Sequence, residues 1–125
     1  MLDTRTFLWW VTDDRRLPVN IRAIIEDVRN EICFSAVSAL EIVIKAQSQR
    51  IAFVGNPRSF VADQLTANTF RQLPIDVRHA LRVFSLPLIH RDPFDRMLIA
   101  QAIEEDLMLL SHDAVIKEYD VSVIW

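Results

Sequence analysis

The feature that most constrains the fold of this chain is the alternation of short apolar runs with longer amphipathic segments along its whole length. The apolar runs have the length of strands, and the amphipathic segments have the three-and-four spacing of helices that bury one face. Such alternation predicts an α/β fold, in which a parallel sheet lies between layers of helices. The only glycine is Gly55, which favours regular elements over a loop-rich chain.

The positions of these segments predict a three-layer α/β/α sandwich with a mainly parallel sheet of four to five short strands. Strands are expected at residues 1–2, 32–36, 73–75, 107–110 and 121–124. Helices are expected at residues 4–11, 18–29, 38–49, 57–67, 76–84, 95–105 and 113–119, the second with a buried stripe of Ile21, Ile24, Ile25 and Val28. The first strand is short for its role, since ordinary strands have about five or six residues.

Length and composition indicate one folded domain, residues 1–125. A chain of 125 residues, 51% hydrophobic and 25% charged, can bury one sizeable core without disulfides. Its apolar runs are far shorter than the ~20 residues of a membrane-spanning helix, and no signal peptide is recognisable, so we expect a cytoplasmic protein that does not contact a membrane. The single cysteine, Cys33, lies in an apolar run, where we expect a buried structural thiol.

The charge balance excludes a protein that coats nucleic acid by bulk electrostatics. There are 14 Lys and Arg residues against 17 Asp and Glu residues, a formal charge of -3. Binding to nucleic acid must therefore be local, and Arg5, Arg91 and Arg96 lie close in sequence to the acids considered next. Arg91 and Arg96 are predicted to contact backbone phosphates of a substrate; the alternative is that these arginines are solvated or ion-paired on the surface.

Four carboxylates stand where a strand gives way to a helix or where a helix begins: Asp3, Glu41, Asp95 and Asp113. In parallel α/β sheets, a reactive crevice forms at the carboxyl ends of the strands. Acids gathered there repel one another by ~4 kcal/mol per close pair at an effective dielectric constant near 20, so they take up protons or hold a cation. Oxygen ligands select Mg²⁺ or Mn²⁺, which can activate a water for attack on a phosphodiester.

Each of these acids also has a purely structural interpretation. Ser38-x-x-Glu41 has the form of a capping box, Asp113 can cap a helix, and the helix dipole alone stabilises an acid at Asp95. Asp76 follows a predicted strand and precedes a predicted helix as Asp113 does, and Asp92, Asp13 and Asp14 are further acids with no distinguishing signal. Position alone therefore selects too many candidates.

Several other chemistries lack their motifs. His79, His90 and His112 do not have the spacing of a zinc helix, and together with Cys33 they form no recognisable zinc ligand set. The chain has no glycine-rich phosphate loop and no Gly-x-Ser-x-Gly. A phosphatase with an aspartate nucleophile would need a second Asp where Arg5 stands.

Four segments carry a resemblance to a known family. They are Leu2-Asp3-Thr4-Arg5-Thr6-Phe7-Leu8-Trp9-Trp10, Ser35-Ala36-Val37-Ser38-Ala39-Leu40-Glu41-Ile42, His90-Arg91-Asp92-Pro93-Phe94-Asp95-Arg96-Met97-Leu98-Ile99-Ala100-Gln101-Ala102 and Leu110-Ser111-His112-Asp113. Over its whole length the chain resembles PIN-domain proteins of the VapC toxin type. The His-Arg-Asp-Pro-Phe-Asp-Arg block is the most specific part of the match.

The resemblance implies a PIN fold and the activity of a Mg²⁺- or Mn²⁺-dependent endoribonuclease, the toxin of a toxin–antitoxin pair. It implies that Asp3, Glu41, Asp95 and Asp113 are the catalytic acids and metal ligands. Thr4, Ser38 and Ser111 match polar positions that orient those carboxylates or metal-bound water. The implied partners are an RNA substrate, a VapB-like antitoxin and a second copy of the chain.

Two residues depart from the pattern. Arg5 stands where relatives often have His, and Leu40 where they often have Trp, which bears on substrate fit or packing. Two rival functions stay open at this point: an RNA-binding or regulatory module of the same fold with little turnover, and a flap-type DNA nuclease.

Overall fold

The computed structural model describes residues 1–52 and 55–125 and has parallel strands between two groups of helices. The strands are β1 (Cys33–Ser35), β2 (Arg71–Leu73), β3 (Leu109–Leu110) and β4 (Val123–Ile124). The α-helices are α1 (Thr4–Val11), α2 (Val19–Glu26), α3 (Ala36–Gln47), α4 (Pro57–Ala67), α5 (Val77–Arg82) and α6 (Pro93–Glu104), and the 3-10 helices are η1 (Val83–Ser85) and η2 (Ala114–Glu118). This arrangement confirms the predicted α/β fold class.

Leu2 joins the strands into one sheet. β1 pairs in parallel with β2, and β3 pairs in parallel with β4. Leu2 forms parallel bridges to Phe34 of β1 and to Leu110 of β3, so the order across the sheet is β2, β1, Leu2, β3, β4. The start of the chain therefore occupies the centre of the sheet, and the predicted first strand exists as this short central segment.

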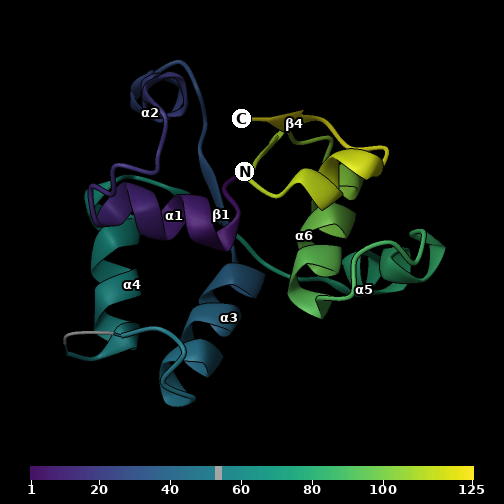
Figure 1. Ribbon diagram of the computed structural model, residues 1–125, viewed down its shortest axis with the longest axis horizontal. Coiled ribbons are helices and arrows are strands. Elements are labelled where there is room, and N and C mark those ends of the chain that lie inside the picture. Colours follow the sequence, from purple (N-terminus) through teal and green to yellow (C-terminus); the bar gives the residue numbers. More distant parts are fainter. Residues whose placement is uncertain (53–54) are drawn as a thin grey trace.

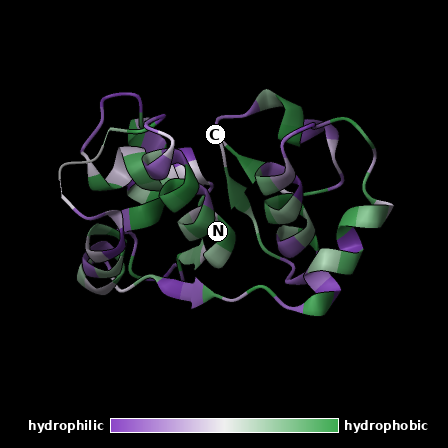
Figure 2. Cartoon of the chain, turned by 90° about the horizontal axis from the view of Figure 1, so that it is seen from below, coloured by the Kyte–Doolittle hydropathy of each residue, from purple (hydrophilic) through white to green (hydrophobic). Residues whose placement is uncertain are grey.

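Two hydrophobic clusters cover the opposite faces of the sheet. Neighbouring strand residues alternate between them: Cys33 belongs to one cluster and Phe34 to the other, as do Leu109 and Leu110. The first cluster is filled mainly by α6 and the second by α1, α2 and α4. Figure 1 shows α1, α2 and α4 on one side of the strands and α5 and α6 on the other, and Figure 2 shows the strands between these layers from below.

Helix α3 connects the two layers at the edge of the sheet where the strands end. It begins directly after β1 and contacts α1 and α4 on one side and α6 on the other. Its residue Val37 belongs to the first cluster and Ile42 to the second. The helix is therefore held from both sides, and the side chains on its first turns face the carboxyl ends of the strands.

Several predicted boundaries need correction. The second helix ends at Glu26 and not at residue 29, and Val28, predicted to be buried, is 97% exposed. The Asp27 carboxylate accepts a hydrogen bond from the Arg29 amide, an alternative to the helical bond pattern that ends the helix. The third helix begins at Ala36, capped by Ser35, so Ser38 lies inside it.

Boundaries in the second half of the chain also shift. β2 begins two residues before the predicted strand, α6 begins at Pro93, and the last predicted helix is the 3-10 helix η2. Cys33 is fully buried, as expected. Among the described residues, no helix is long and apolar enough to cross a membrane.

Candidate metal centre at the carboxyl edge of the sheet

The four predicted acids line one small cavity. Asp3 follows the central segment of the sheet, Asp113 follows β3, Glu41 lies on α3 and Asp95 lies in the first turn of α6. The cavity has a volume of about 40 Å³, enough for one water or ion, and Thr4, Arg5, Lys45 and Asp92 complete its lining. Distant parts of the chain therefore bring these carboxylates together, as the sequence predicted.

Asp3 is the most buried of the aspartates in this cavity. It caps the start of α1, and its Oδ1 accepts a hydrogen bond of 2.6 Å from the Thr6 amide. Burial raises the pKa of the Asp3 carboxyl, although hydrogen bonds from the Ser111 hydroxyl and the Thr6 amide oppose the rise. These hydrogen bonds therefore offset only part of the cost of burying the ionised Asp3 carboxylate.

Glu41 is held by hydrogen bonds inside the protein. It is 4% exposed, and its Oε2 accepts a hydrogen bond from the Thr4 hydroxyl, which also lies 3.0 Å from the Ser38 hydroxyl. Its Oε1 forms an ion pair with Lys45, one helical turn further along α3. The capping-box interpretation of Ser38 and Glu41 is wrong, because the helix begins at Ala36, Glu41 lines the cavity and the Ser38 hydroxyl contacts Thr4.

Asp95 and Asp113 share one histidine neighbour. The Nε2 of His90 lies 3.3 Å from Oδ2 of Asp95 and 3.1 Å from Oδ2 of Asp113. Burial raises the pKa of Asp95 to about 6, and the nearby carboxylates of Asp92, Glu41 and Asp113 add to the rise, while His90 opposes it. Asp95 is thus harder to ionise than an exposed aspartate.

Asp113 has the opposite tendency. Burial alone would raise its pKa, but hydrogen bonds from His90 and from the Val115 amide outweigh burial and hold the pKa of Asp113 below its ordinary value. The Val115 amide donates across 2.9 Å, since Asp113 caps η2. The Ser111 hydroxyl, buried beneath, accepts a hydrogen bond of 3.1 Å from the Asp113 amide. Thr4, Ser38 and Ser111 thus all contact groups of the predicted site.

Three residues near the acids were not predicted as site residues from the sequence. His90 accepts a hydrogen bond on Nδ1 from the Asp92 amide, which places its proton on Nε2, the nitrogen that faces Asp95 and Asp113. Asp92 lines the cavity and also caps α6 through the Phe94 amide. Lys45 contributes the ammonium beside Glu41. In the sequence, what pointed to a role for His90 and Asp92 near the acids was their place in the His-Arg-Asp-Pro block.

The two arginines predicted to contact phosphate differ in position. Arg91 is exposed. Arg96 is 9% exposed, and its guanidinium donates hydrogen bonds to the carbonyl oxygens of Val83, Leu86 and Pro87. The predicted phosphate contact of Arg96 needs correction. The guanidinium N–H groups that would bind a phosphate already donate to backbone carbonyls between η1 and α6. Arg5 is exposed and lines the acidic cavity.

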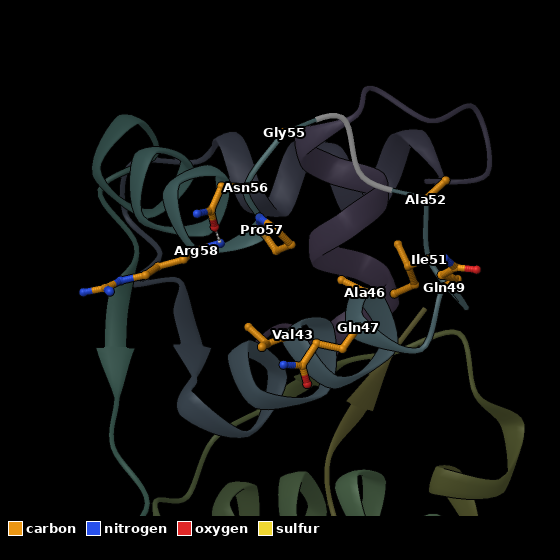
Figure 3. A pocket seen from close by; sticks show the side chains of 10 residues that line it. All are labelled: Val43, Ala46, Gln47, Gln49, Ile51, Ala52, Gly55, Asn56, Pro57 and Arg58. Carbon is orange, nitrogen blue, oxygen red and sulfur yellow. Dashed lines mark hydrogen bonds between the residues drawn. The ribbon is translucent and has the colours of Figure 1, made fainter.

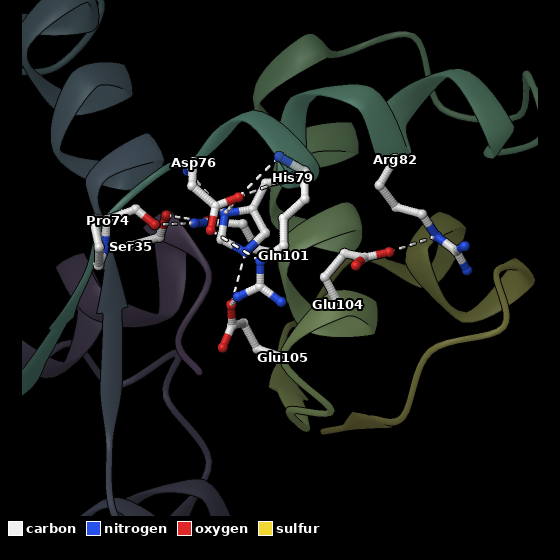
Figure 4. A network of polar contacts seen from close by, with 9 residues as sticks. Ser35, Pro74, Asp76, His79, Arg82, Gln101, Glu104 and Glu105 are labelled. Carbon is white, nitrogen blue, oxygen red and sulfur yellow. Dashed lines mark hydrogen bonds and ion pairs between the residues drawn. The ribbon is translucent and has the colours of Figure 1, made fainter.

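A second polar cluster joins the start of α5 to Glu105 at the end of α6 (Figure 4). Asp76 caps α5, and the buried His79 closes a capping box with it while its Nε2 lies 2.9 Å from Oε1 of Glu105. Arg78 forms ion pairs with both Asp76 and Glu105. The side chains of Asp76, His79 and Glu105 lie close enough to one another to bind a single metal ion. Each of them already has a hydrogen-bond or ion-pair partner, and these contacts fix the start of α5.

A larger cavity of about 610 Å³ lies between the end of α3 and the start of α4 (Figure 3). The described residues that line it are aliphatic or carry amides, apart from Arg58, and include no carboxylate. It therefore offers volume without acid, base or metal-ligand chemistry, and the smaller acidic cavity is the better candidate for a reactive site.

The small cavity fits a hard divalent cation. Five carboxylates line it, against the cationic side chains of Arg5 and Lys45. The raised pKa of Asp3 and of Asp95 means that their ionised forms lack sufficient positive charge nearby. A set of carboxylate oxygens is the donor set of Mg²⁺ and Mn²⁺. Asp95 has one oxygen with no hydrogen-bond partner among the described residues, whereas the oxygens of Asp3, Asp113 and Glu41 accept hydrogen bonds or ion pairs and would use their remaining lone pairs to hold such an ion.

Comparison with known proteins agrees with the fold. The chain belongs to the PIN domain family, whose model matches residues 1–122. Within this family it is similar to Ribonuclease VapC22 of Mycobacterium tuberculosis (strain ATCC 25618 / H37Rv), with 28% identity over 120 residues, 95% of this chain and 90% of the relative. These matches confirm the resemblance to VapC-type PIN-domain proteins.

A solved structure supports the same fold. The crystal structure of VapBC2 from Rickettsia felis, bound to a DNA fragment from its promoter, superposes with a TM-score of 0.73 over 100% of this chain and 97% of the other. Because the two sequences are 14% identical, this likeness concerns the fold alone.

Proposed function

We propose that this chain is a VapC-type ribonuclease that hydrolyses RNA phosphodiester bonds with Mg²⁺ or Mn²⁺ as its cofactor. The observation that carries the proposal is the convergence of Asp3, Glu41, Asp95 and Asp113 on one cavity. The name of the relative VapC22 gives the class of reaction. When bound, the cation would supply Lewis acidity and lower the pKa of a water near the scissile phosphate.

The residues of the cavity divide into two groups in this proposal. Asp95 would hold the cation through an oxygen without a hydrogen-bond partner among the described residues, and Asp3 and Asp113 through lone pairs that their hydrogen bonds leave unused. Glu41, fixed by Thr4, orients a water or accepts its proton as general base. Ser38 and Ser111 keep Thr4 and Asp113 in place through the contacts described above.

Cleavage assays with matched variants test this proposal. Asp3→Asn and Asp95→Asn retain the shape of the side chain but remove a charge, so we expect Mn²⁺-dependent cleavage of RNA to fall at least 100-fold with the fold intact by circular dichroism. Asp76→Asn is the matched control: Asn also caps a helix, and Asp76 lies in the separate cluster of Figure 4. Undiminished cleavage in either site variant would refute the proposed site.

Titration with Mn²⁺ separates the nuclease from an RNA-binding module of the same fold. The module remains a rival because Lys45 and His90 already partner Glu41, Asp95 and Asp113, so that the fold does not depend on a cation. Binding of Mn²⁺ that is lost in Asp95→Asn, together with RNA cleavage, favours the nuclease. Preference for branched DNA over RNA would instead favour the flap-type nuclease.

The proposed biological role is that of the toxin in a toxin–antitoxin pair, with a VapB-like antitoxin and a second copy of the chain as partners. Exposed apolar side chains support association with protein: Leu81, Phe84 and Leu88 lie near one another in sequence from α5 onward, and Phe84 is 96% exposed. Large apolar side chains gathered on a surface mark interaction sites. Size-exclusion chromatography with light scattering tests the homodimer, and co-expression with the neighbouring reading frame tests the antitoxin.

A further inference from the structure

Lys45 is the cationic side chain placed deepest in the acidic cavity. It projects from α3 one turn after Glu41, its side chain is 29% exposed, and it lines the cavity together with the acids. Arg5, the other cation of the lining, is exposed at the rim. Lys45 is therefore a partly buried positive charge beside carboxylates.

The pair of Lys45 and Glu41 is not an ordinary surface ion pair. Surface pairs of Glu and Lys four residues apart are common on helices and contribute little. Here the Glu41 side chain is 6% exposed and its other oxygen is bound by Thr4. A lysine kept beside a buried carboxylate, with its ammonium in the lining of a cavity, is positioned for more than helix stability.

A substrate phosphate needs positive charge at this place. Each phosphodiester brings one further negative charge to a cavity where five carboxylates already outnumber two cationic side chains. Arg96 cannot provide the charge, because its guanidinium serves backbone carbonyls. The ammonium of Lys45 has three N–H donors, and Glu41 is the one partner that it has among the described residues.

We propose that Lys45 binds the phosphate of the RNA at the site of cleavage while remaining paired with Glu41. The inference rests on the ribonuclease proposed above and assigns to its site a substrate-binding residue that the sequence did not indicate. Lys45 holds a non-bridging phosphate oxygen next to Glu41, and thereby places the phosphorus close to the carboxylate that orients the attacking water.

The test compares Lys45→Met and Lys45→Arg with Lys117→Met. Lys117 is the other lysine of the chain; it is exposed on η2 and outside the lining of the cavity, which makes it a matched control. Lys45→Gln is a second neutral variant should the methionine variant fail to fold. Three quantities are measured: binding of a labelled single-stranded RNA pool of random sequence in chelator, between 50 and 200 mM salt; kcat and KM of cleavage with Mn²⁺; and Mn²⁺ affinity by calorimetry.

We expect Lys45→Met to weaken RNA binding but not Mn²⁺ binding. Loss of the ammonium raises the RNA Kd and KM about tenfold, and the slope of log affinity against log salt falls by ~0.7, the loss of one phosphate contact to a single strand. Mn²⁺ affinity does not fall, because a positive charge has been removed from beside the carboxylates. Lys45→Arg recovers most RNA affinity, and Lys117→Met changes none of the three quantities.

Two results would overturn the proposal. If Lys45→Met lowers kcat but leaves KM and the salt slope as in the wild type, then Lys45 only positions Glu41. If RNA and Mn²⁺ affinity fall together, the lysine supports the structure of the cavity and does not bind phosphate. Failure of the proposed function itself is distinguishable, since the wild-type protein would then not cleave RNA at all, whether or not it binds the RNA pool, and the role of Lys45 at a cleavage site would fall with it.

Discussion

The Nε2 of His90 lies 3.1 Å from Oδ2 of Asp113 and so connects the loop before α6 with the segment that follows β3. The same nitrogen lies 3.3 Å from Asp95. Because its Nδ1 accepts the Asp92 amide proton, the neutral imidazole has one N–H to offer, and that N–H faces two carboxylates proposed as metal ligands. His90 therefore influences how readily these acids ionise.

Replacing His90 by alanine should shift metal binding to higher pH. The hydrogen bond from His90 lowers the pKa of Asp113, and His90 also opposes the raised pKa of Asp95, so both acids become harder to ionise without it. We expect the pH midpoint of Mn²⁺ binding to rise by roughly half a unit or more. Calorimetric titrations between pH 5.5 and 8 measure it; His112→Ala, whose ring stacks beside Trp125, serves as control. An unmoved midpoint would contradict the assignment.

The stability of the metal-free protein should depend on Asp95. Its pKa of about 6 exceeds the ~3.9 of an unfolded chain, so between these values the native state binds a proton that the unfolded state has lost. The free energy of unfolding consequently falls as pH rises through 6. Asp95→Asn removes this term, and we expect the variant to exceed the wild type by about 1 to 2 kcal/mol at pH 7.5 and by much less at pH 4.5.

Urea denaturation in chelator at these two pH values measures the difference between the two proteins. A difference that stays constant with pH would show that the Asp95 charge does not cause it. Added Mn²⁺ should reverse the order at pH 7.5, because a ligand of the native state stabilises the wild type that binds it.

Arg96→Met should destabilise the fold, and it should not weaken RNA binding by removing a phosphate contact. The substitution leaves the carbonyls of Val83, Leu86 and Pro87 without the donor that binds them, at a cost of about 2 to 4 kcal/mol. Thermal unfolding measures the loss.

Arg91→Met is the paired variant. Arg91 is exposed, so the free energy of unfolding should change by less than ~0.5 kcal/mol. If Arg91 contacts a phosphate, the slope of log RNA affinity against log salt should fall by ~0.7 in this variant.

Asp76→Ala should separate helix capping from catalysis. The side chain of Asp76 accepts the amides of Arg78 and His79 at the start of α5, and loss of such a cap costs about 1 kcal/mol. We expect this loss in denaturant unfolding and an unchanged rate of RNA cleavage per folded molecule. A large fall in the rate would mean that the cluster of Figure 4 has a part in the reaction.

The sequence predicted the fold well where local signals agree with tertiary structure. The bounds of α1 and α4 match their predicted ranges, since each helix starts beside an aspartate or a proline that begins helices. The end of α2 was wrong because the apolar spacing continues to Val28 although Asp27 and Arg29 bond locally instead. Ser35 and Ser38 both offer a plausible cap for α3, and only the pairing of β1 with β2 decides between them.

The acids of the candidate site were predictable for a general reason: the carboxyl ends of parallel strands meet at one edge of a sheet. Asp3 and Asp113 were found in this way. The side chains that modulate them were not, because neither the pair of Glu41 and Lys45 nor the reach of His90 differs in sequence from a common surface feature. The contacts of His90 depend on where the loop before α6 lies relative to the segment after β3, and those of Lys45 on the burial of Glu41; periodicity carries no information about either.

The bridge between Leu2 and Leu110 unites the start of the chain with a strand formed near its end. Asp3 comes directly after Leu2, and Asp113 stands in the segment that follows Leu110, so this one pairing holds two acids of the cavity at the same edge of the sheet. A substitution that breaks the pairing would therefore separate the acids as well as the strands, and the shape of the cavity is tied to the stability of the centre of the sheet.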